Sequence, residues 1–162
     1  MSAGHVCGTC NLCCKVMEIR ELNKPEGIWC AHCKPGRGCG IYEVRPTPCR
    51  EFSCQWLTTP ELPDSLRPDR TKVVLTMAAD GATLLALCEP ANPMAWRKEP
   101  IYSLLKDRAR KMRGSDFPVF ARCGARLWWV APDKDVDLGL SGPHGAHNVE
   151  IDGVEVTIRM SD

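Results

Sequence analysis

Short apolar runs come in pairs along residues 70–162, and a few residues that include glycine separate the two runs of each pair. This pattern is typical of antiparallel hairpins, and Asp-Gly in the first and third turns is a strong hairpin signal. We therefore predict three hairpins in this part of the chain. Their strands are Lys72–Met77 with Thr83–Cys88, Val119–Arg122 with Arg126–Val130, and Asn148–Ile151 with Val154–Arg159.

One segment, Pro100–Arg113, carries the pattern of a helix. Proline stands at its start and Gly114 lies just past its end, as is usual for helix termini. Its apolar positions are Ile101, Leu104, Leu105 and Met112. A helix on one face of a sheet of hairpins is an α+β arrangement. We predict an α+β fold in which an irregular N-terminal segment precedes a small antiparallel sheet of three hairpins with one main helix.

Residues 1–57 differ from the rest because they hold few bulky aliphatic side chains and many prolines and glycines. Such a composition predicts a loop-rich path. Three prolines between positions 58 and 69 favour an extended, semi-rigid connection. The sequence thus divides into a cysteine-rich module (residues 1–57), a proline-rich linker (58–69) and a small α+β body (70–162).

Charge and hydropathy restrict the classes of partner. The formal net charge of the 162 residues is +1, so no overall electrostatic attraction to nucleic acid or to a membrane is expected. The longest mostly apolar stretch, residues 73–88, is shorter than the ~20 residues of a membrane-spanning helix. The N-terminal residues show no basic and apolar regions of a secretory signal. We expect a cytoplasmic location and neither a nucleic-acid nor a membrane partner.

Cysteine is the residue that bears most on function. Nine of the eleven cysteines lie between Cys7 and Cys54, and most of them are close together in the sequence. Such spacing suits either a disulfide framework or metal ligation, and a reducing cytoplasm favours metal thiolates. The odd total would also leave one thiol unpaired. The predicted metal ligands are Cys7, Cys10, Cys13, Cys14, Cys30, Cys33, Cys39, Cys49 and Cys54.

Zinc is one candidate metal, with one to three ions. Four thiolates make a closed tetrahedral zinc site, so nine allow two sites with one cysteine to spare. Nine also suffice for a three-metal cluster in which three sulfurs bridge. Cys13 and Cys14 are adjacent, and neighbouring side chains point in different directions. This step therefore favours two closely spaced metals over one tetrahedron.

An iron–sulfur centre is the other candidate. The run Cys7-x2-Cys10-x2-Cys13 begins like a ferredoxin motif, but Met17 stands where the fourth ligand belongs. Cys10-x3-Cys14 resembles part of a radical-SAM triplet, whose third cysteine position is again Met17. Neither motif is complete. A 4Fe–4S cluster or another iron centre held by a different set of these cysteines stays open.

Basic residues accompany the cysteines, and they could offset the net negative charge of bound thiolates. They are Lys15, Lys34, Arg37, Arg45 and Arg50.

The remaining two cysteines, Cys88 and Cys123, lie on a predicted strand and at a predicted turn. We interpret Cys88 as a small buried apolar residue and Cys123 as a free thiol at the surface. No nucleophile–base pair and no phosphate-binding loop is evident. We therefore predict no catalytic residues.

The cysteine pattern resembles that of the bacterial CxxCxxCC proteins, called YkgJ-like and described as zinc- or iron-chelating. The first match is the signature from Cys7 to Cys14. The second is Cys39-Gly-Ile-Tyr-Glu-Val-Arg-Pro-Thr-Pro-Cys49-Arg-Glu-Phe-Ser-Cys54, which is similar to the family segment C-x-I-Y-x-x-R-P-x-x-C-R-x-F-x-C. The resemblance covers about residues 7–57. It implies that the cysteines of both segments are metal-site residues, and Cys30 and Cys33 join them on spacing.

A similar module occurs in flagellin lysine methylases, where it is associated with an iron–sulfur cluster. Our leading hypothesis is a metal-binding protein with a structural or metal-handling role and no catalysis of its own. The first alternative is an iron–sulfur enzyme or redox component, for methyl or electron transfer. The second is an adaptor that binds a protein partner through a surface bearing Trp96, Arg97 and Lys98.

Overall fold

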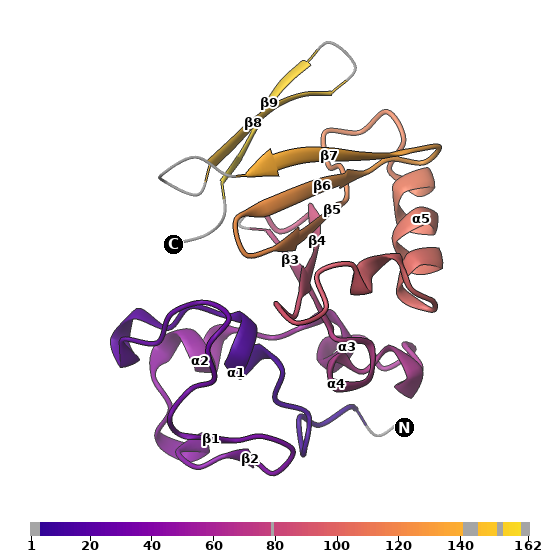
Figure 1. Cartoon of the computed structure of the whole chain (residues 1–162). Coiled ribbons are helices and arrows are strands. Elements are labelled where there is room, and N and C mark those ends of the chain that lie inside the picture. The colour runs from indigo at the N-terminus through magenta and orange to yellow at the C-terminus, as the bar shows by residue number, and fades with distance from the viewer. Residues whose placement is uncertain (1–3, 79, 141–145, 152–153, 160–162) are drawn as a thin grey trace.

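The computed structural model describes residues 4–78, 80–140, 146–151 and 154–159. The fold is α+β, as predicted, and its centre is a five-stranded sheet with the strand order β3-β4-β5-β6-β7 (Figure 1). The strands are β3 (Val73–Met77), β4 (Leu84–Cys88), β5 (Phe120–Cys123), β6 (Arg126–Val130) and β7 (Asp135–Leu140).

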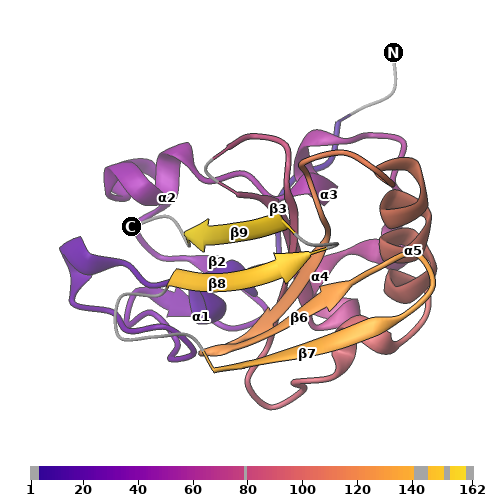
Figure 2. The same ribbon diagram turned by 90° about the horizontal axis from the view of Figure 1, so that it is seen from above.

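All three predicted hairpins are present. Strand β3 pairs antiparallel with β4, and β5 pairs antiparallel with β6. The third hairpin, β8 (Ala146–Ile151) with β9 (Val154–Arg159), forms a two-stranded sheet of its own (Figure 2). Its predicted Asp-Gly turn at residues 152–153 lies outside the described residues.

The central sheet is mixed and not wholly antiparallel as predicted, because β4 and β5 run parallel. The main helix, α5 (Ile101–Lys111), lies between these two strands in the chain. Parallel neighbours need such a crossover. Strand β7 was not predicted at all. Its aspartates have low strand propensity, and the structure compensates for this with ion pairs from Lys106 to Asp135 and from Arg126 to Asp137.

Both faces of the sheet are covered, which explains why all five residues of β4 are buried. One face packs against α5 and contains Val73, Ala86 and Cys88. The other face contains Val74, Leu85 and Phe120, and it receives Leu12 and Val16 from the N-terminal third. Figures 1 and 2 place α5 on one side of the molecule and the cysteine-rich segment on the other.

Trp96 corrects one expectation. It belongs to a short 3-10 turn, η4 (Ala95–Arg97), and its side chain is fully buried. Its ring centroid lies 5.7 Å from that of Trp128 on β6. The large ring fills the core between α5 and the sheet, so the prediction that Trp96 lies at the surface is wrong.

From residue 4 onward, the described part of the N-terminal third has only short elements, in agreement with the predicted irregular, cysteine-rich segment. They include α1 (Cys13–Val16), β1 (Cys33–Lys34), β2 (Gly38–Cys39), α2 (Thr47–Glu51) and α3 (Gln55–Thr58). Because Leu12, Val16 and Trp56 are buried in the two core clusters, this segment also contributes apolar side chains to the core.

Residues 58–69 are not simply extended. They contain a 3-10 turn, η3 (Asp64–Leu66), and the start of helix α4 (Pro68–Thr71). Pro68 opens α4 at a first-turn position, which proline tolerates. Leu66 is buried against the core, which ties this segment to the sheet. Among the described residues, no helix is both long and apolar enough to cross a bilayer.

Candidate metal centre

All eleven cysteines are free thiols in the structure, so no disulfide framework is present. The short N-terminal elements position those from Cys7 to Cys54. Cys13 and Cys14 begin α1, Cys33 and Cys39 lie opposite each other in the β1–β2 ladder, and Cys49 lies within α2. The structure distributes the nine predicted ligands between two neighbouring groups.

The first group lines one cavity of about 20 Å³ beside Trp56 and Val74. A cavity of this size admits a single atom-sized guest. Its cysteines come from the first loop and from the residue before α3. We call it the four-cysteine cavity, and its cysteines are Cys7, Cys10, Cys13 and Cys54.

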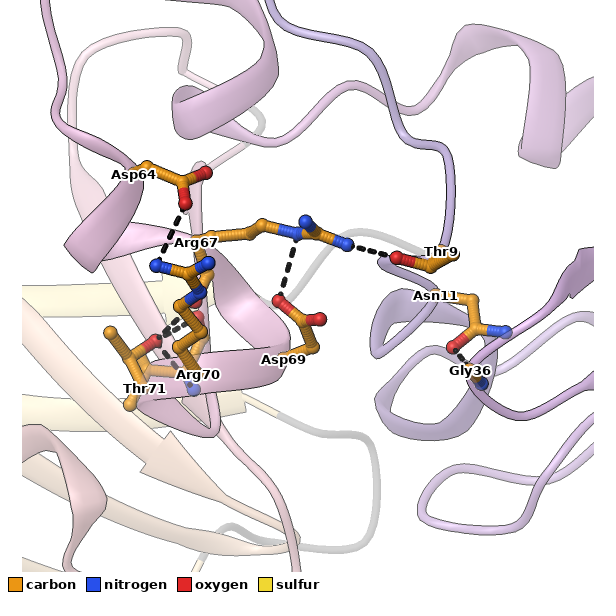
Figure 3. A network of polar contacts seen from close by, with 9 residues as sticks. Thr9, Asn11, Gly36, Asp64, Arg67, Asp69, Arg70 and Thr71 are labelled. Atoms are coloured by element: carbon orange, nitrogen blue, oxygen red, sulfur yellow. Dashed lines mark hydrogen bonds and ion pairs between the residues drawn. The ribbon is translucent and has the colours of Figure 1, made fainter.

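Helix α4 contributes to this cavity as well, which the sequence did not suggest. Burial raises the pKa of Cys10, although hydrogen bonds from the Asp69 N–H and the Arg67 guanidinium favour its thiolate. Arg67 also contacts Thr9 at 2.5 Å and Asp69 at 3.0 Å (Figure 3). An arginine in a proline-rich stretch gave no signal of this role, because its target lies far away in sequence.

The second group surrounds Cys14, and we call it the Cys14 group. Cys13 donates a hydrogen bond to Cys14, which lowers the pKa of Cys14 and raises the pKa of Cys13. Cys14 also shares a hydrogen bond with Cys33, whose pKa is raised, chiefly by burial. The charges of Cys14, Cys30 and Cys39 act on both Cys33 and Cys49, and these five cysteines make up the group.

Asn11 holds the β1 turn against the CxxCxxCC loop. Its side-chain N–H groups donate to the sulfur of Cys33 at 3.1 Å and to the carbonyl of Lys34 at 3.0 Å. The Gly36 N–H donates to the Asn11 carbonyl oxygen at 3.4 Å (Figure 3). Asn11 is buried, and its hydrogen bonds fix the position of Cys33 in the Cys14 group. Its place inside the signature was the only sequence signal for this role.

Lys24 is a buried cation beside the cysteines, and it was not among the basic residues singled out from the sequence. Its ammonium group donates to the backbone carbonyls of Lys15, at 2.8 Å, and Met17. Burial lowers the pKa of Lys24, while the charges of Cys14 and Cys30 oppose that effect. The hydrogen bonds to the end of α1 therefore hold the positive charge of Lys24 close to the Cys14 group.

Arg45, which the sequence did single out, lies over the ring of Tyr42 at 3.7 Å. Its pKa is raised, first by its contact with Tyr42 and also by the charges of Cys7 and Cys39. It therefore lies within electrostatic reach of both groups.

The thiols are gathered but not arranged as a finished coordination shell. Within the described ranges, no group of three or more Cys, His, Asp or Glu side chains could hold a metal ion as they stand. The donor chemistry nevertheless suits a soft metal, because unpaired thiols line a small cavity and meet around Cys14. No protein-family model, curated protein or solved structure matches the chain.

Proposed function

We propose that residues 1–57 form a thiolate metal-binding module of the YkgJ-like CxxCxxCC type, with two neighbouring centres. The observation that carries this proposal is the division of nine free cysteines between the four-cysteine cavity and the Cys14 group. Four sulfurs equal the number in a closed tetrahedral zinc site, and five supply the same number with one to spare.

The adjacent residues Cys13 and Cys14 support two centres over one. Cys13 lines the cavity, while Cys14 hydrogen-bonds Cys33 of the other group. The peptide bond between them would therefore join the two centres. Ligation would require cysteine side chains to turn toward a common point, which rotation about χ1 between staggered positions provides.

Zinc is the metal we propose, and its role is structural or metal handling without catalysis. A bound metal would supply thiolate cross-links between loops that lie far apart in sequence. Lys24 and Arg45 would offset the resulting negative charge from fixed positions. We place the protein in the cytoplasm, because unpaired thiols persist in a reducing compartment. Metal ions are the partners this site would take.

Elemental analysis of anaerobically purified protein tests the proposal. We expect two zinc ions per chain and no visible absorption. Cys10→Ser removes a ligand of the cavity and Cys49→Ser removes one of the Cys14 group, so each variant should lose zinc from its own centre. Cys88→Ser, outside both groups, is the matched control and should keep both ions.

The outcomes separate the alternatives. Visible absorption that bleaches on reduction would replace zinc with the iron–sulfur centre and would support the redox alternative. Loss of all metal from either single variant would contradict two separate centres. Purified protein without stoichiometric metal would contradict the proposal as a whole.

A further inference from the structure

Cys88 and Cys123 lie outside both cysteine groups, at matching ends of two parallel strands. Strands β4 and β5 pair in register from Leu85 with Phe120 to Leu87 with Arg122, and the two cysteines are the next residue of each strand. Neighbouring strands lie roughly 4.8 Å apart, and disulfides join Cα atoms about 4.4–6.8 Å apart. The backbone spacing is therefore within the range of a disulfide.

The two side chains also share a face of the sheet. Cys88 is buried in the core cluster beneath α5, and Cys123 packs against the edge of the same cluster. The sulfur of Cys123 lies 3.9 Å from the backbone oxygen of Glu89, the residue after Cys88. The pair stands one position beyond the last bonded pair of the parallel ladder, while Cys88 pairs with Val73 of β3 and Cys123 pairs with Arg126 of β6.

We propose that Cys88 and Cys123 form a reversible disulfide by exchange with a small-molecule disulfide such as oxidised glutathione. Cys123 is partly exposed and Cys88 is buried, so Cys123 meets the oxidant first. Its sulfur attacks one glutathione sulfur, which gives a mixed disulfide and releases one reduced glutathione. The Cys88 sulfur then attacks the Cys123 sulfur and releases the second. Two protein thiols are oxidised, one glutathione disulfide is reduced, and both protons pass to the released thiols.

The surroundings make this exchange slow at neutral pH. Burial raises the pKa of Cys88 to about 12 and also raises that of Cys123. The thiolate is the attacking species, so the rate follows the thiolate fraction. Below the pKa, this fraction grows about tenfold with each unit by which the pH rises. The disulfide should therefore form faster as the pH rises.

The pair lies at the junction between the cysteine-rich segment and the sheet. Glu89, next to Cys88, pairs with Lys15, and Arg122, next to Cys123, pairs with Glu26. A cross-link between β4 and β5 at this point would therefore act on the strand ends that hold the N-terminal segment. This inference does not depend on which metal, if any, the cysteine-rich module binds.

Peptide mapping tests the proposal, because trypsin leaves Cys88 and Cys123 each as the single cysteine of its peptide. Cleavage after Lys72, Arg97, Arg122 and Arg126 gives the peptides 73–97 and 123–126. Purified protein with its metal is incubated with oxidised glutathione, its free thiols are then blocked with N-ethylmaleimide in denaturant, and it is digested without reductant. We expect these two peptides to appear joined, after a transient glutathione adduct of Cys123, and to separate on reduction.

Cys88→Ala is the control, with its fold checked by circular dichroism. In this variant the glutathione adduct of Cys123 should accumulate, because no second thiol displaces it. The proposal is overturned if the wild-type peptides stay unlinked, whether both carry the blocking group or the Cys123 adduct persists. It is equally overturned if Cys123 is found joined to a cysteine of the N-terminal groups.

Discussion

The ammonium group of Lys15 lies 2.6 Å from the carboxylate of Glu89 and joins helix α1 to the residue that follows β4. Both side chains are largely buried, with exposed fractions of 17% and 11%. Asn92 donates a second hydrogen bond to the same carboxylate at 2.9 Å. The cysteine-rich segment is thus held to the sheet by a desolvated ion pair as well as by apolar packing.

Glu89→Gln should destabilise the protein, because it leaves the Lys15 cation without its partner in a largely buried position. Breaking such a pair costs about 3 kcal/mol of unfolding free energy, and urea denaturation measures it. The control is Glu18→Gln, which affects an exposed pair with Arg20 and should cost less than about 0.5 kcal/mol. Equal losses of unfolding free energy in the two variants would show that the Lys15–Glu89 pair stabilises the fold no more than an exposed pair does.

The same pair should make stability depend on pH. The hydrogen bond from Lys15 holds the pKa of Glu89 below its ordinary value of 4.5. A carboxylate whose folded pKa is lowered stabilises the fold above its unfolded pKa, and that contribution is lost as the pH falls through the folded value. The stability difference between wild type and Glu89→Gln should therefore be full near neutral pH and shrink below about pH 4.5. A difference that stays constant into acid would contradict this linkage.

Gly27→Ala tests a second contact of the same junction. Gly27 has a φ of +77°, and a Cβ placed there would lie 2.9 Å from Cγ of Pro90. Gly36 has a similar φ of +72° but open space around it. Both alanine variants carry the left-handed backbone penalty of roughly 1 kcal/mol, and only Gly27→Ala adds a clash. Thermal unfolding should show a lower midpoint for Gly27→Ala than for Gly36→Ala. Equal midpoints would mean that the ring of Pro90 moves aside without a measurable cost in stability.

Lys106 on α5 fixes strand β7, which the sequence did not predict. Its buried ammonium group donates to the carbonyls of Ala131 and Lys134 and to the Asp135 carboxylate at 2.6 Å. Lys106→Met removes all three bonds and leaves Asp135 partly unpaired, at a cost of about 3 kcal/mol. Amide exchange in β7 should accelerate in this variant. Lys111→Met, at an exposed position of the same helix, should leave β7 protected.

The sequence predicted what local pattern controls and missed what distant contacts supply. The hairpin of β3 and β4 was correct because apolar runs and an Asp-Gly turn specify it within the short stretch from Val73 to Cys88. Strand β7 was missed because its aspartates are stabilised by Lys106 and Arg126 from other elements. The predicted nine cysteines do gather in two groups, but Arg67 and Lys24 beside them carried no local signal. Arg67 and Lys24 acquire these roles only in the folded chain, which places Arg67 beside Cys10 and Lys24 beside Cys14.

Cys14→Ser should lose metal and unfold the N-terminal third, whereas Cys88→Ser should leave the metal content unchanged. Cys14 contacts Cys13 of the four-cysteine cavity and Cys33 of its own group, so its loss affects the link between the two proposed centres. Cys88 packs in the core on the face that α5 covers. Elemental analysis measures the metal. Limited trypsin digestion measures the unfolding, because Arg20, Lys24 and Arg37 lie within the affected segment. If both variants lost equal amounts of metal, the assignment of Cys14 to the metal module and of Cys88 to the core would be wrong.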